Sequence, residues 1–165
     1  MLLYLLRHGI AEDHGSRGSD AERELTDEGR EKTGLAMQAA RAMRLVPPTL
    51  VISSPYARAR QTAEIAMSEF AKHSELEIST ALVPSADIYT TMALVAEAIK
   101  RLSPLMLVGH EPHLSSFGSA LLGSPTPIIE MKKASLAKFE IYKLDVPRMR
   151  GALTALIPPK IGSLL

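Results

Sequence analysis

The feature that most constrains this chain is a repeated pair of patterns: a short apolar run without polar alternation, followed by a polar turn and a helical pattern. The runs are Leu2 to Leu6, Leu50 to Ile52 and Leu105 to Val108. Strands of a parallel sheet lack alternation because helices cover both faces of the sheet. The sequence therefore predicts an α/β fold with a mostly parallel sheet.

The helical patterns lie directly after these runs. Residues 26–45 carry an apolar stripe, with Thr26 as a plausible N-cap and two prolines after the end. The stretch SSPYARARQTAEIAMSEF predicts a helix from about residue 55 to 72, with Pro55 at its first position, where proline is tolerated. Residues 88–102 predict a third helix, and a fourth follows the run that ends at Val108.

The remaining segments are consistent with one domain. LEISTALVPSAD (76–87) reads as a strand that leaves into a loop. ASLAKFEIYKL (134–144) and GALTALIP (151–158) alternate partly with period two, which predicts a terminal antiparallel pair. No repeat, low-complexity tract or long linker divides the chain, so we expect a single domain over residues 1–165.

Composition excludes several classes of function. Lysine and arginine number 19 against 18 acidic residues, for a net charge of +1, and aromatic residues make up 4% with no tryptophan. We therefore expect no binding to nucleic acid or to an anionic membrane. The chain has no cysteine, which excludes disulfides and fits a reducing compartment. The initial apolar run is too short for a signal peptide or membrane span, so we expect a soluble cytoplasmic protein.

Cationic and imidazole side chains follow three of the predicted strands. Arg7 and His8 end the first, Ser54 and Arg58 follow the second, and His110 follows the run that ends at Val108. The carboxyl ends of parallel strands meet at one edge of a sheet, where ligands bind. Two arginines and two histidines at one desolvated edge would repel one another, so an anion is expected between them.

These residue types favour a phosphoryl group. The arginine fork matches phosphate oxygens, and a neutral histidine supplies a nucleophilic nitrogen, which nearby Arg7 and Arg58 keep unprotonated. Gly9 lets the backbone approach closely, and Ser54 with the following helix adds donors. The combination predicts phosphoryl transfer through a covalent phosphohistidine.

At this point the sequence resembles a known family, the histidine phosphatase superfamily, also called phosphoglycerate mutase-like, and within it the small phosphohistidine phosphatases of the SixA type. The resemblance rests on LLRHG (5–9), ELTDEGREKT (24–33), VISSPYARARQTAEI (51–65), LVP (82–84) and LVGHEPHLSSF (107–117). The order and spacing of these motifs cover nearly the whole chain.

The resemblance implies a fold and a set of roles. The fold is a three-layer α/β/α sandwich. His8 is the nucleophile, Arg7 and Arg58 bind the transferring phosphate, and His110 hydrogen-bonds that phosphate and helps stabilise the transition state. No metal or other cofactor is implied. The connections are short compared with those of larger relatives, which implies an open site suited to a phosphate on another protein.

One departure from the family concerns the general acid. Many relatives that cleave phosphomonoesters carry a Glu or Asp after the third strand, whereas here the region reads LVPSADIYTT, whose only carboxylate is Asp87. Asp87 is a possible acid and equally a possible N-cap for the helix at residue 88. Glu12 and Asp13 follow the nucleophile and could also approach.

A missing acid favours a particular substrate. An alkoxide leaves poorly without a proton, whereas the protonated imidazole of a phosphohistidine leaves as a neutral ring. The leading hypothesis is therefore a phosphohistidine phosphatase that acts on a signalling or phosphotransfer protein. The alternatives are a broad-specificity phosphatase of small phosphometabolites and a non-catalytic phosphate-binding module.

Two further patterns are a pair of histidines and a glycine-rich stretch. His110 and His113 are spaced like a pair of metal ligands, but Pro112 intervenes and no third ligand has a defined spacing, so a metal site is disfavoured. HGSRGSD (14–20) lacks a nucleotide-loop pattern and predicts a flexible loop beside the site that could contact a partner protein.

Overall fold

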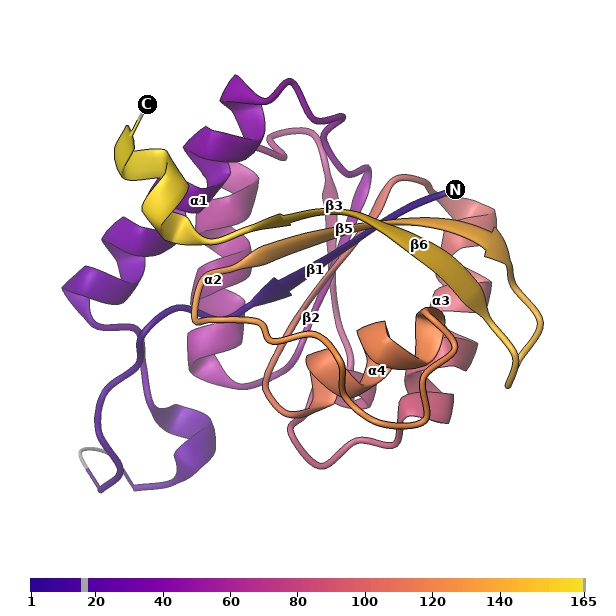
Figure 1. Ribbon diagram of the computed structural model, residues 1–165. Coiled ribbons are helices and arrows are strands. Elements are labelled where there is room, and N and C mark those ends of the chain that lie inside the picture. The colour runs from indigo at the N-terminus through magenta and orange to yellow at the C-terminus, as the bar shows by residue number, and fades with distance from the viewer. Residues whose placement is uncertain (16–17, 165) are drawn as a thin grey trace.

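The computed structural model describes residues 1–15 and 18–164. They form a six-stranded sheet in the order β3-β2-β4-β1-β5-β6 (Figure 1). The first four strands in this order are parallel to one another. Strand β5 pairs antiparallel with β1, and β6 pairs antiparallel with β5. The strands are β1 (Leu2–Arg7), β2 (Leu50–Ser53), β3 (Glu75–Ile78), β4 (Leu105–Gly109), β5 (Leu136–Lys143) and β6 (Arg150–Ile157). The helices are α1 (Asp27–Ala42), α2 (Ala57–Glu69), α3 (Ile88–Arg101) and α4 (His113–Leu121), with short 3-10 helices η1 (Asp20–Glu22), η2 (Thr80–Leu82) and η3 (Pro159–Leu164).

The predicted α/β fold with a mostly parallel sheet is confirmed, with small differences at the boundaries. Helix α2 begins at Ala57, after Tyr56 as N-cap, and not at Pro55. The reason lies in Ser54, whose hydroxyl accepts a hydrogen bond from the Tyr56 N–H and pairs with His110. Ser54 therefore stabilises the turn that precedes α2 and is not the N-cap of this helix.

The sheet is the middle of three layers. Leu3 and Leu5 of β1 belong to the hydrophobic core under α3 and α4. Tyr4 and Leu6 belong to the core under α1 and α2. Successive side chains of a strand point to opposite faces, so an unbroken apolar run supplies both cores at once. Figure 1 shows α1 and α2 on one side of the sheet and α3 and α4 on the other.

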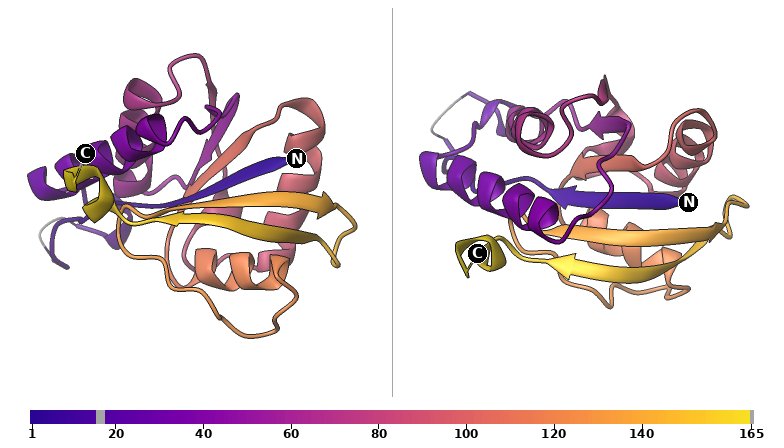
Figure 2. Two further views of the ribbon diagram at one scale, coloured as in Figure 1. Left: turned by 45° about the horizontal axis from the view of Figure 1, so that its top comes forward. Right: turned by 90° about the horizontal axis from the view of Figure 1, so that it is seen from above.

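The end of the described chain closes one flank of the fold. Helix η3 follows β6 and lies against α1, as both views in Figure 2 show. Among residues 1–15 and 18–164, no helix has the length and apolar character needed to cross a membrane.

Pairing of the parallel strands fixes the position of the site. The main-chain N–H of His8 donates to the Gly109 carbonyl over 3.0 Å, and that of Ser54 donates to the Val108 carbonyl over 2.9 Å. Strands β1, β2 and β4 therefore end at the same edge of the sheet. This edge holds His8, Ser54 and His110 side by side.

Candidate active site

A cavity of about 440 Å³ opens at this edge. His8 and His110 line it, together with four cationic side chains, which are Arg7, Arg23, Arg58 and Lys133. Arg7, His8, Arg58 and His110 thus come together, although they lie far apart in the sequence. Four carboxylates, those of Glu12, Asp13, Asp20 and Glu111, line the cavity as well, so its suitability for an oxyanion rests on the arginine side chains beside the two histidines.

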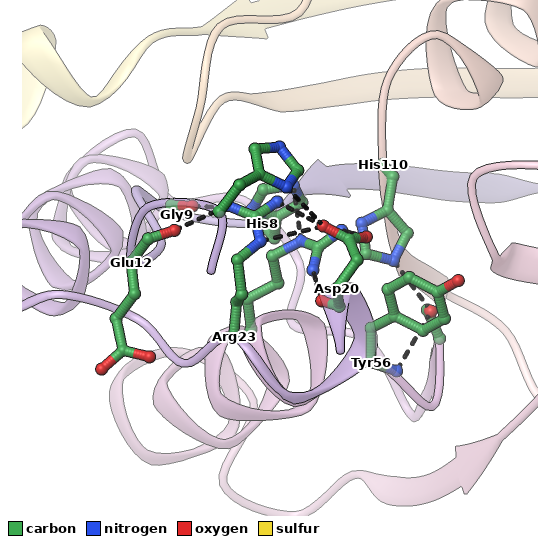
Figure 3. Close-up of polar contacts among 10 residues, drawn as sticks. His8, Gly9, Glu12, Asp20, Arg23, Tyr56 and His110 are labelled. Atoms are coloured by element: carbon green, nitrogen blue, oxygen red, sulfur yellow. Dashed lines mark hydrogen bonds and ion pairs between the residues drawn. The ribbon is translucent and has the colours of Figure 1, made fainter. Parts of the chain in front are cut away.

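The tautomer of His8 is set by its neighbour in the chain. Nδ1 of His8 lies 2.7 Å from the carbonyl oxygen of Gly9 (Figure 3). A carbonyl oxygen only accepts, so Nδ1 carries the proton and Nε2 carries the lone pair. Nε2 faces the Nε–H of Arg58 at 3.4 Å. The nitrogen available for attack on an anion in the cavity is therefore Nε2.

His8 is also kept neutral. His8 is buried, with only 7% of the residue exposed. Burial lowers its pKa to about 3, helped by the charges of Arg58, Arg7 and Lys133 and opposed by the bond to Gly9. The lone pair on Nε2 is consequently available at neutral pH.

Two arginines reach the cavity from different elements. Arg7 ends β1 and donates from Nη1 to the Met131 carbonyl over 2.7 Å, and its buried Nε has no partner among the described residues. Arg58 lies in the first turn of α2, with its guanidinium carbon 5.0 Å from the centre of the Tyr56 ring. Both side chains line the cavity together with His8.

His110 lies against His8. The two imidazole ring centres are 4.9 Å apart, and the Tyr56 ring meets His110 edge-on at 5.0 Å. Nε2 of His110 pairs with the Ser54 hydroxyl over 2.8 Å, while Nδ1 is buried without a partner in the described chain. Burial, then the charges of His8 and Arg58, lower the pKa of His110 to about 2. Ser54, proposed from sequence as a phosphate donor, is fully buried and here orients His110.

The Arg-x-x-Gln-Thr part of the motif VISSPYARARQTAEI (51–65) attaches two loops to α2. Thr62 Oγ1 donates to the Arg58 carbonyl and accepts from the Gly9 N–H at 3.1 Å. Oε1 of Gln61 accepts from the Leu25 N–H at 2.8 Å. In this structure the Gly9 N–H therefore already donates its hydrogen bond to a side chain of α2. A Cβ on Gly9 would lie 2.7 Å from the Gly29 carbonyl oxygen, so the loop after His8 packs directly on α1.

The carboxylates are arranged differently from the family pattern. Asp87 accepts a hydrogen bond from the Tyr89 N–H and is the N-cap of α3. Of residues 79–87, Pro84 alone lines the cavity, whereas Glu12 and Asp13 both do. Glu111, directly after His110, lines it as well, and its Oε1 is buried without a hydrogen-bond partner in the described part of the chain. Burial raises the pKa of Glu111, and Ser115 and Arg7 oppose that rise only in part.

Two residues of the cavity do not stand out in the sequence. Asp20 in η1 bonds to Arg58, and Arg23 bonds to Asp20 (Figure 3). Asp20 is the last residue of the glycine-rich loop (14–20) that the sequence predicts beside the site, and Arg23 follows it; residues 16 and 17 of this loop lie outside the described residues. The only sequence signal is the spacing of an acid and an arginine three apart, which is common on protein surfaces.

The two histidines considered as metal ligands point to different partners. Nε2 of His113 pairs with the Thr91 hydroxyl of α3 over 2.8 Å, whereas His110 pairs with Ser54. Over residues 1–15 and 18–164, no group of three or more His, Cys, Asp or Glu side chains is arranged to hold a metal ion.

Comparison with known proteins places this geometry in a family. Residues 3–83 match the model of the histidine phosphatase superfamily (branch 1). A relative from Picosynechococcus sp. strain PCC 7002, an uncharacterized protein, is 34% identical over 140 residues, which cover 82% of each chain.

Solved structures give the same answer for the fold. The protein histidine phosphatase SixA complexed with tungstate has a TM-score of 0.85 and 22% identity, with 98% of this chain and 99% of that chain covered. A candidate phosphohistidine phosphatase SixA from Agrobacterium tumefaciens has a TM-score of 0.79 and 25% identity, covering 96% and 97%. A mycobacterial glucosyl-3-phosphoglycerate phosphatase has a TM-score of 0.71 and 21% identity, covering 93% and 97%. With its Arg-His-Gly loop at the edge of this sheet, the chain belongs to the histidine phosphatase superfamily.

Proposed function

We propose that this protein hydrolyses phosphorylated substrates through a covalent phosphohistidine on His8 Nε2. The observation that carries the proposal is the fixed tautomer of His8: Nδ1 donates to Gly9, so the lone pair of Nε2 faces Arg58 inside the cavity. A neutral imidazole with its lone pair directed at an anion site is a nucleophile.

The chemistry follows in two steps. Nε2 of His8 attacks phosphorus, and the bond to the leaving group breaks with its electron pair. Arg7 and Arg58 donate hydrogen bonds to the non-bridging oxygens as charge develops, and Nδ1 of His110 is the free nitrogen for a third contact. Water then attacks the phosphorus on His8, the electron pair of the N–P bond returns to Nε2, and inorganic phosphate leaves. The cationic side chains supply the positive charge, so we expect no requirement for a metal.

Quenching in alkaline detergent after mixing with a radiolabelled substrate, in the presence of EDTA, tests this proposal. We expect an acid-labile, base-stable phosphoryl label on His8 that is absent from His8→Ala and retained by His73→Ala, a histidine outside the cavity. A wild-type protein that binds phosphate but never acquires or releases the label would be a binding module and would overturn the proposal.

We further propose that the preferred substrate is phosphohistidine on a signalling or phosphotransfer protein. In support, Asp87 is used as an N-cap, and no carboxylate of residues 79–87 lines the cavity. A phosphohistidine ring protonated on its other nitrogen leaves as neutral imidazole and needs no acid from the enzyme. The similarity in fold to SixA structures is consistent with this choice.

Glu111 supports a second candidate, a phosphatase of small phosphometabolites. Its carboxyl lines the cavity next to His110, and burial raises its pKa. A carboxyl with a raised pKa is suited to donate a proton to a departing alkoxide. Phosphoester cleavage by a relative of similar fold, the glucosyl-3-phosphoglycerate phosphatase, agrees with this alternative.

A substrate panel separates the two candidates. We compare a phosphohistidine peptide, p-nitrophenyl phosphate and serine phosphate at equal concentration, with wild type and Glu111→Gln. The phosphohistidine proposal predicts fast turnover of the peptide that Glu111→Gln leaves within about threefold, since no proton from an acid is needed. Serine phosphate turned over as fast as the peptide, with a loss of about 100-fold or more in Glu111→Gln, would establish the second candidate instead.

A further inference from the structure

Arg58 uses its two edges for different purposes. The end-on pair of nitrogens, Nη1 and Nη2, donates to the main-chain carbonyl of Asp20 over 2.6 Å and to its carboxylate Oδ2 over 2.9 Å. The side-on edge, which carries Nε, faces Nε2 of His8 at 3.4 Å. Asp20 thus occupies Nη1 and Nη2, whereas Nε is left facing His8.

Asp20 is itself held in place. Its Oδ1 accepts from Nε of Arg23 at 2.9 Å and lies 2.7 Å from Nη2 of the same side chain (Figure 3). Nη1 of Arg23 donates to the Glu12 carbonyl over 2.6 Å. An unbroken series of contacts therefore runs from the main chain at Glu12 through Arg23 and Asp20 to Arg58.

The burial of these groups shows which one depends on the other. The Arg58 side chain is 4% exposed and that of Asp20 is 41% exposed. A buried guanidinium needs a counter-charge and several acceptors, and Asp20 supplies both from one residue. Burial raises the pKa of the Asp20 carboxyl, but the bonds from Arg58 and Arg23 outweigh it and lower that pKa. Asp20 is therefore a carboxylate wherever the enzyme would work.

We propose that Asp20 is a positioning residue for phosphoryl transfer, which clamps Arg58 end-on so that the Nε edge meets the phosphoryl group on its way to His8. The inference rests on the proposed function. A different role would be that of a stand-in anion, in which the carboxylate occupies the site and an incoming phosphate displaces it. The two roles predict opposite changes in the affinity for oxyanions.

The test compares Asp20→Ala and Asp20→Asn with Glu22→Gln. Glu22 lies in the same 3-10 helix and its replacement removes the same charge, but its carboxylate bonds to Ser19 and not to Arg58. The readouts are the affinity for tungstate, kcat and KM for p-nitrophenyl phosphate, and the thermal midpoint of unfolding. We expect Asp20→Ala to bind tungstate more weakly and to lose about 100-fold in kcat/KM, since misplaced groups cost this much.

Partial rescue is expected from the conservative variant. Asp20→Asn keeps an acceptor for Nη2 and should lose only about tenfold, while Glu22→Gln should stay within about twofold of wild type. Tighter tungstate binding in Asp20→Ala would establish the stand-in role and overturn the proposal. An equal loss in Glu22→Gln would also overturn it, because the effect would then come from η1 as a whole.

A double-mutant cycle with Arg58→Ala tests whether Asp20 affects the reaction through Arg58. If Asp20 acts through Arg58, Asp20→Ala should cost nothing further in the Arg58→Ala background. A full additional loss in that background would overturn the proposal, even if the single variant folds poorly. Failure of wild type to label His8 would count against the proposed function instead, so the two failures are distinguishable.

Discussion

His8 acquires its reactive form from one neighbour in the chain and several across the fold. The Gly9 carbonyl fixes the proton on Nδ1, a contact that the local backbone supplies. Burial and the charges of Arg58, Arg7 and Lys133 lower its pKa to about 3, and these come from distant parts of the sequence. The imidazole at this strand end is therefore neutral, with its lone pair on Nε2.

This shift predicts that His8 does not titrate in the range where free histidine does. The imidazole should remain neutral as the pH falls from 8 to about 4, because its pKa lies near 3 and not near 6.5. Arg58→Gln removes one positive charge and should move the titration midpoint upward. Chemical shifts of the ring nitrogens, assigned with His8→Gln, measure both. A wild-type midpoint near 6.5 would contradict the prediction.

At the scale of the element, the first two turns of α2 serve as the frame of the site. Arg58, Gln61 and Thr62 are spaced three and four apart, so they share one face of the helix. Arg58 enters the cavity, Gln61 holds the chain before α1, and Thr62 holds the loop after His8. One helix thereby fixes Arg58 relative to His8.

Thr62→Val tests how much the hydrogen bond between α2 and the loop after His8 contributes to stability. Valine keeps the shape of threonine but removes the acceptor for the buried Gly9 N–H, which should lower the free energy of unfolding by about 1–3 kcal/mol. Thr62→Ser retains a hydroxyl and should be closer to wild type. Urea unfolding of the three proteins is the measurement. Equal stability of Thr62→Val and wild type would show that the contact is dispensable.

At the scale of the whole molecule, the site makes the fold sensitive to acid. His8, His110 and His113 are all buried, and burial lowers the pKa of each. Below pH 6.5 the unfolded chain binds protons at these positions that the folded chain does not bind. Stability is therefore greatest above pH 6.5 and falls as the pH decreases toward the lowered values.

The slope of this loss is a prediction. Each fully unprotonated buried histidine should reduce the free energy of unfolding by about 1.4 kcal/mol per pH unit below pH 6.5. Glu111 acts in the opposite direction, because its raised pKa favours the protonated folded state. Urea unfolding at pH 7.5, 6, 5 and 4.5 measures the slope, and His8→Gln should make it shallower. Stability that does not change over this range would contradict the assignment of buried neutral histidines.

The sequence by itself determined the layers of this molecule and four residues of its site. Uninterrupted apolar runs require cover on both faces, and period two divides β1 between two cores. Because parallel strands end at one edge, residues directly after them must meet there. Arg7, His8, Arg58 and His110 were predictable for that reason, since each sits at a fixed offset from an element that local patterns reveal.

Tertiary structure alone decided the rest. Asp20 and Arg58 are 38 positions apart, and no local period relates them. The same holds for Ser54 behind His110 and for the Gly9 N–H on Thr62. Glu111 adjoins His110 in sequence, yet its burial beside Arg7 depends on how β4 and β1 pair. Local sequence sets which elements form and which residues end them, whereas the pairing of distant elements sets which charges share a buried cavity and, through burial, their protonation.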